Sequence, residues 1–142
     1  MGRINVGRAI LGGLVAGVVL NIGETILNVP ILGAQYDAAM QALGVEPVAG
    51  AAIAVFFVLG FVLGIGQVWL YAAIRPRFGA GARTAVIAGL AVWAFAAAFP
   101  NIGIMVMRLF PSNLLWISLV WTLFEYPLAT LAGAWVYREG AA

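Results

Sequence analysis

The chain contains no cysteine, no histidine and no lysine. Without cysteine, disulfides, thiolate metal sites and cysteine nucleophiles are excluded. Without histidine, the chain lacks the commonest general base and the usual metal and haem ligand, and without lysine it cannot form a Schiff base. We therefore expect no cofactor and no metal site.

Charge is also scarce. Only 8% of the 142 residues are charged and 65% are hydrophobic, whereas soluble domains usually carry about 25% charged residues. Because so few polar groups cannot cover a water-facing surface, lipid must be the solvent for most of the chain. All seven basic residues are arginines, and their positions follow a topological pattern. The net charge of +2 therefore does not indicate a nucleic-acid partner.

Four long apolar stretches are separated by charged residues and prolines. A helix of about 20 apolar residues crosses a bilayer. The first stretch continues through Asn21 and Glu24 to Pro30 without a clear A-x-A site, which favours a retained span over a cleaved signal peptide. We predict an all-α integral membrane protein, a four-helix bundle with short loops forming one domain over residues 1–142. The predicted spans are residues 9–29, 48–74, 84–107 and 113–137.

The arginines gather on one side of these spans. Arg3 and Arg8 precede the first span, residues 75–83 hold three arginines between the second and third, and Arg138 follows the fourth. The opposite side carries two acidic residues and one arginine. By the positive-inside rule, both termini face the cytoplasm and the protein lies in the cell (inner) membrane. An aromatic belt is expected near the cytoplasmic interface at Trp69, Tyr71, Trp135 and Tyr137, and near the outer one at Trp116.

The first loop, residues 31–46, is the longest. Within it Tyr36, Met40 and Leu43 fall at helical spacing. This pattern predicts a short amphipathic helix on the outer membrane surface, although an ordinary connector fits the loop equally well.

Small and polar residues form one stripe along each span. Helices in lipid associate through such residues, and spacings of three and four place them on one helix face. We expect the four stripes to turn toward a shared axis, with Gly-x-x-x-Gly pairs in the first two spans letting the backbones approach closely. The stripes are Gly13, Gly17, Asn21, Glu24 and Asn28; Gly60, Gly64, Gln67 and Tyr71; Ala94, Ala97, Asn101 and Arg108; and Ser118, Thr122, Glu125, Ala129 and Ala132.

The polar members of these stripes define a candidate site for a proton, an ion or a substrate. Glu125 lies near the middle of its span, and a carboxyl at that depth costs about 2.5 to 3.5 kcal/mol on insertion scales. A carboxyl that holds or releases a proton there is what a proton-coupled carrier requires. The alternative is that these side chains only fix helix packing. The site residues are Glu24, Glu125, Asn21, Asn101 and Asn28.

Two prolines lie inside predicted spans. Pro100 and Pro127 remove the backbone bonds to the carbonyls of Ala96 and Leu123, and we expect both to kink their helices. A freed carbonyl near Glu125 is a potential ligand for a cation or water.

The leading hypothesis is a small proton- or cation-coupled transporter or channel, homo-oligomeric and without enzymatic activity. A second is an accessory or assembly subunit of a larger membrane complex, consistent with the small size and with Trp93, Trp116 and Trp121. A third is an intramembrane enzyme acting on lipid, which would need the two glutamates as acid and base.

Overall fold

The computed structural model describes residues 3–137, and this part of the chain is helical without any strand. Four of its helical rods are long and apolar enough to cross a membrane, which confirms that part of the prediction. The third rod consists of α4, η2 and α5 in continuous succession, and the segments labelled η are π-helical. The elements are α1 (Val6–Ile26), η1 (Leu27–Ile31), α2 (Gly33–Ala42), α3 (Ala51–Phe78), α4 (Ala82–Trp93), η2 (Ala94–Ala98), α5 (Phe99–Met107) and α6 (Ser112–Val136).

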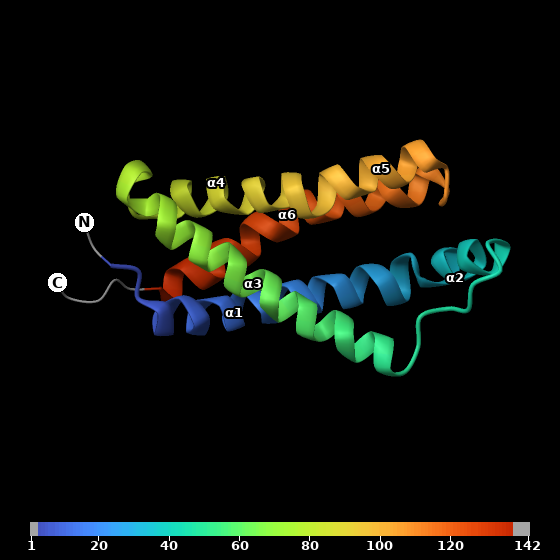
Figure 1. Cartoon of the computed structure of the whole chain (residues 1–142), viewed down its shortest axis with the longest axis horizontal. Coiled ribbons are helices and arrows are strands. Elements are labelled where there is room, and N and C mark those ends of the chain that lie inside the picture. Colours follow the sequence, from blue (N-terminus) through green and yellow to red (C-terminus); the bar gives the residue numbers. More distant parts are fainter. Residues whose placement is uncertain (1–2, 138–142) are drawn as a thin grey trace.

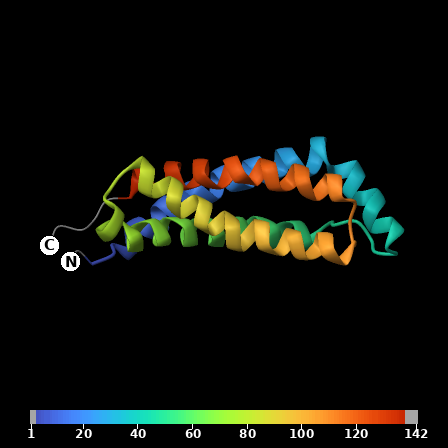
Figure 2. The ribbon, with the colours of Figure 1, turned by 90° about the horizontal axis from the view of Figure 1, so that it is seen from above.

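The four rods run side by side along the long axis of the molecule (Figures 1 and 2). The backbone N–H of Asn5 donates to the Tyr137 hydroxyl at 3.3 Å, so the two described ends of the chain meet. We call this the termini end, which also holds the α3–α4 turn, and the opposite end, with α2 and Pro111, the loop end. Arg138, which contributes to the orientation argument, lies outside the described residues.

The prolines do not end the helices where the sequence suggested. The first rod runs past Pro30 through a π turn in which Leu32 N–H donates to Leu27 O at 2.8 Å. A second π segment, η2, ends at Ala98, two residues before Pro100. A π turn is wider than an α turn, so it gives room to a proline ring that would otherwise clash with the preceding turn. Bends at Pro100 and Pro127 stay predictions.

Helices α1 and α3 touch backbone to backbone through glycine, as predicted. A Cβ added to Gly64 would lie 2.5 Å from both the Gly13 carbonyl oxygen and the Gly17 nitrogen. Gly13 also lies directly against Ile65, and Gly17 against Phe61. The contact therefore depends on the absence of side chains at these positions.

A second face of α1 packs against α6, which corrects the expectation of one stripe per helix on a shared axis. A Cβ added to Gly12 would lie 2.5 Å from the Gly133 carbonyl oxygen, and Ala16 also contacts Gly133. Gly12 and Gly13 are adjacent in sequence, so they point about 100° apart. They therefore serve two different neighbours. Small residues at Gly12, Ala16 and Gly23 were the available sequence signal for this second face.

Tyr71 and Tyr137 are buried at the termini end and do not belong to an aromatic belt. Their rings meet edge to face with centroids 6.0 Å apart. The Tyr71 hydroxyl accepts from the Gly81 N–H at 3.2 Å, and the Arg75 guanidinium lies 5.7 Å from the Tyr137 ring centroid. Trp69 and Trp135 are exposed on the bundle surface, as side chains of a belt would be.

The short helix predicted in the first loop is present as α2 (Figure 2). It is tied to the loop end of α6, because the Tyr36 hydroxyl and Ser118 Oγ share a hydrogen bond of 2.9 Å. The Tyr36 ring also meets Phe110 edge to face. A membrane-surface position for α2 stays a prediction.

Candidate functional site

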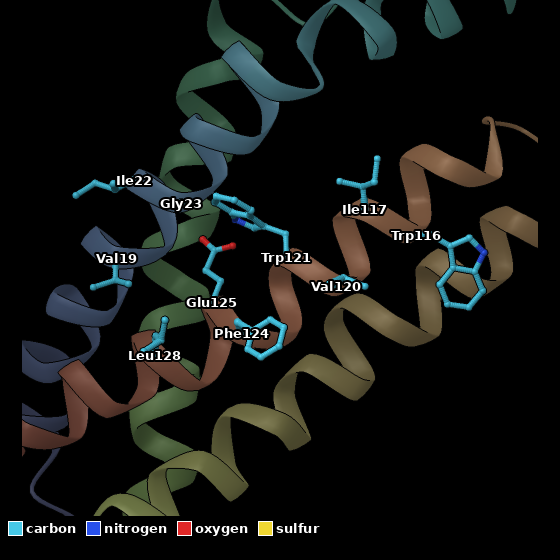
Figure 3. A pocket seen from close by; sticks show the side chains of 10 residues that line it. All are labelled: Val19, Ile22, Gly23, Trp116, Ile117, Val120, Trp121, Phe124, Glu125 and Leu128. Atoms are coloured by element: carbon cyan, nitrogen blue, oxygen red, sulfur yellow. The ribbon is translucent and has the colours of Figure 1, made fainter.

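Glu125 lies in α6 with only 6% of its surface exposed. One carboxyl oxygen rests directly on Gly23 of α1, where any side chain would overlap it. One turn earlier on α6, the indole of Trp121 lies beside the same carboxyl (Figure 3). The glycine thus makes room for the carboxyl between two closely packed helices.

The polar atoms around Glu125 are unpaired. Neither carboxyl oxygen of Glu125 has a hydrogen-bond partner among the described residues, and the same is true of Trp121 Nε1. Two N–H groups, the Trp121 indole and the Glu24 main chain on α1, lie close enough to interact electrostatically with the carboxyl, but neither has the geometry of a hydrogen bond. An unpaired buried polar group costs about 1 to 3 kcal/mol. These groups are therefore available to a proton, a water molecule or a ligand.

Glu24 supplies a second carboxyl from α1. Asn28 Nδ2 donates to Glu24 Oε2 at 2.6 Å and to the Glu24 main-chain oxygen at 2.9 Å. The Glu24 carboxylate is close enough to interact electrostatically with Glu125 and with Tyr126. In the described part of the chain, no arginine contributes to the surroundings of either carboxyl. Within residues 3–137, the pair of carboxyls therefore has no basic side chain as a counter-charge.

Asn21 and Asn101, also predicted for this site, have other partners. Asn21 Nδ2 donates to the Phe57 carbonyl of α3 at 3.1 Å. Asn21 also lines a separate groove of about 320 Å³ between α1 and α3. Asn101 Nδ2 donates to the Ala97 carbonyl of its own rod at 2.9 Å. The structure thus brings together Glu24, Asn28 and Glu125, while the recorded bonds of the other two asparagines are packing contacts.

A groove of about 710 Å³ runs between α1 and α6 beside Glu125 (Figure 3). This volume falls within the range of about 300 to 1,000 Å³ typical of small-molecule sites. The groove opens on the outer surface of the helix pair, because several of its lining side chains are exposed. Glu125 is the only ionisable side chain in its wall. The lining residues are Val19, Ile22, Gly23, Trp116, Ile117, Val120, Trp121, Phe124, Glu125 and Leu128.

Helix α4 packs against the side of α6 that lies away from the groove. Trp93 Nε1 donates to the Leu119 carbonyl and to Thr122 Oγ1, both at 3.2 Å. Gly89 of α4 lies against the backbone of Pro127, where a Cβ would come within 2.7 Å. These contacts fix the side of α6 away from the groove.

Sequence reasoning missed several residues of the site. Trp121 lies four residues before Glu125, and this helical spacing would have been enough to predict that the two side chains are neighbours. Gly23 was detectable as a small residue on the second face of α1. Outside the site, Gln67 was assigned to a stripe as a packing group, and it is fully buried with its amide oxygen and nitrogen unpartnered. No pattern in the sequence indicated that this amide lacks partners.

The site offers two carboxyls, an indole N–H and a nearby phenol. No group of three or more potential metal ligands occurs in residues 3–137. Comparisons with models of protein families, with curated proteins and with solved structures found no match.

Proposed function

We propose that the chain is a small multi-pass membrane protein that couples proton movement to transport, with Glu125 and Glu24 as the protonatable pair. Membrane insertion is supported by four long apolar helices and by large side chains exposed on their outer faces. Examples are Phe95, Val106 and Trp135, each more than three-quarters exposed. Such a surface is stable in hydrocarbon and not in water.

The observation that supports a protonatable site most directly is the unpaired, buried carboxyl of Glu125. A glutamate retained at this depth only for packing is expected to have cross-helix hydrogen bonds, as Asn21 has with the Phe57 carbonyl. Among the described residues Glu125 has no fully formed hydrogen bond, although the main-chain N–H of Glu24 lies near it, and the Glu24 carboxyl interacts with it from the neighbouring helix. Intramembrane carboxyls with these features are typical of proton relays in transporters.

Proton flux into proteoliposomes tests the proposal. We expect wild-type protein to support flux under a pH gradient and both Glu24→Gln and Glu125→Gln to abolish it. Glu46→Gln is the matched control, because Glu46 is an exposed carboxyl in the α2–α3 loop. Unchanged flux in both site variants, with all variants folded, would contradict the proposal.

The orientation is part of the proposal, with both termini and the α3–α4 turn in the cytoplasm and α2 outside. Single cysteines at Gln41 in α2 and at Ala80 in the α3–α4 turn test it, because both side chains are exposed. Gly79 is less suitable, since its φ of +84° strains any other residue. An impermeant thiol reagent should label only the Gln41→Cys variant in intact cells. Labelling of Ala80→Cys from outside would reverse the orientation.

A second candidate, an assembly subunit of a larger membrane complex, is favoured by one observation. Residues 51–59 of α3 are exposed on every face of the helix, although they include Val55, Phe56 and Phe57. In a complex, a helix of another protein would replace lipid on this segment. Purification in mild detergent separates the two candidates: a reproducible larger partner favours the subunit, and a homo-oligomer favours the transporter.

A further inference from the structure

The groove between α1 and α6 combines aromatic walls with a single carboxyl. Trp116, Trp121 and Phe124 supply flat apolar surfaces from α6, and Glu125 supplies the only ionisable group (Figure 3). Aromatic faces attract cations electrostatically, best when the cation is poorly hydrated. The wall therefore suits a molecule with an apolar body and a positive charge.

The charges around the carboxyl point to the same ligand. Glu24 faces Glu125 from α1, and Tyr126 lies near both on α6. Among the described residues, neither α3 nor α4 contributes a charged group to this environment. An anion would be repelled by whichever of the two carboxyls is ionised, and a neutral lipid tail would leave the Glu125 oxygens without a hydrogen-bond partner.

A metal cation does not fit the groove. Sodium, calcium and magnesium require several oxygen ligands, about six or more for the divalent ions. Here the lining offers only the oxygens of one carboxyl, and no metal-binding cluster occurs in residues 3–137. A cation whose charge is spread over an organic body needs fewer polar contacts, and its body would fill the apolar volume.

From these observations we infer that the groove binds lipophilic organic monocations, which enter sideways from the lipid and place their charge at Glu125. The inference rests on the proposed transport function and names its substrate class. When Glu125 is protonated, its O–H bond breaks as the cation arrives, and the proton is released to the water at the membrane surface. One positive charge replaces another, so the net charge of the groove is unchanged.

Titration calorimetry on the purified protein in lipid nanodiscs tests the inference. The probes are tetraphenylphosphonium and tetraphenylborate, which have the same shape and opposite charge. We expect the phosphonium to bind and the borate not to bind. Repeating the titration in buffers of different ionisation enthalpy should show proton release at a pH where Glu125 is protonated. Glu125→Gln should weaken binding by about ten- to a hundredfold, since it removes a charged partner, whereas Glu46→Gln should leave it unchanged.

A second pair of variants tests binding in the groove without changing Glu125. Val120→Trp fills the groove, while Val62→Trp adds the same ring to an exposed position of α3 outside both grooves. The first variant should abolish phosphonium binding and the second should not. Equal binding of both probes, or full binding by Val120→Trp, overturns the inference. Proton flux that depends on Glu125 without any phosphonium binding would overturn it while leaving the proposed function intact.

Discussion

Helices α1 and α6 meet in two different ways along one interface. Toward the termini end, Gly12 and Gly133 bring the backbones into contact and Val68 of α3 fills the remaining space. Toward the loop end, Gly23 faces the carboxyl of Glu125, and a groove lies between the helices beside it. Small residues on both helices thus close the interface, whereas a small residue opposite a large polar one makes room for a buried carboxyl.

The two ends also differ in how completely their polar groups are paired. At the termini end the hydroxyls of Tyr71 and Tyr137 accept backbone N–H groups, and Thr84 Oγ1 donates to Gly79 O at 2.7 Å. In the groove, Glu125 and Trp121 have no such partners in the described part of the chain. Buried polar groups in native proteins are nearly always paired, so an unpaired one is a candidate position for a water molecule, a ligand or a proton.

The largest effect on stability is expected from Gly133→Ala at the termini end. The added Cβ would lie 2.6 Å from the Gly12 carbonyl oxygen and against Val68. Overpacking of this kind costs about 1 to 3 kcal/mol. Thermal unfolding in detergent measures it, with Gly66→Ala as control because nothing lies within 4 Å of a Cβ there. Equal stability of the two variants would mean that the tight contact does not hold α1 and α6 together.

Gln67 is the exception to the comparison, because it is buried and unpaired but does not line either groove. If it has no ligand, replacing it with methionine, which has a similar shape, removes an unpaired amide. We expect Gln67→Met to raise the free energy of unfolding by about 1 kcal/mol and to leave proton flux unchanged. A loss of flux at full stability would instead make Gln67 part of the proton path.

A smaller effect is expected at the loop end from Tyr36→Phe, which removes the hydrogen bond to Ser118. The loss should be about 0.5 to 1.5 kcal/mol. A double-mutant cycle with Ser118→Ala isolates the pair, and the double variant should be no less stable than either single one. Fully additive losses would show that the two hydroxyls do not act on each other.

Composition was sufficient to predict four apolar helices, because lipid exposure imposes long hydrophobic stretches on the sequence. Residue spacing also identified the glycine contact between α1 and α3 and both carboxyls of the site. Residue spacing did not show which neighbouring helix each face of a given helix contacts. Asn21 and Glu24 were assigned to one stripe, yet Asn21 bonds to α3 while Glu24 interacts with α6.

The groove itself was not predictable from periodicity. Helices α1 and α6 separate toward the loop end (Figure 1), and the spacing of residues along each helix does not show how far apart two helices lie. Likewise, helix ends were placed too early at Pro30 and Pro76, because a π turn and a last helical turn accommodate these prolines. The steric rule for proline predicts a clash with the preceding helical turn. It does not predict that the backbone adjusts locally, as in the π turn at Pro30, and so avoids the clash.

The central claim is that Glu24 and Glu125 act as one coupled protonatable site. Infrared absorption of carboxyl groups, followed across pH in lipid vesicles, tests it most directly. The signal lost in Glu125→Gln identifies Glu125, and its titration midpoint should move when Glu24 is replaced by Gln but not when Glu46 is. A Glu125 signal that titrates at the same pH with and without Glu24, or that shows no protonation change at any pH, would contradict the account.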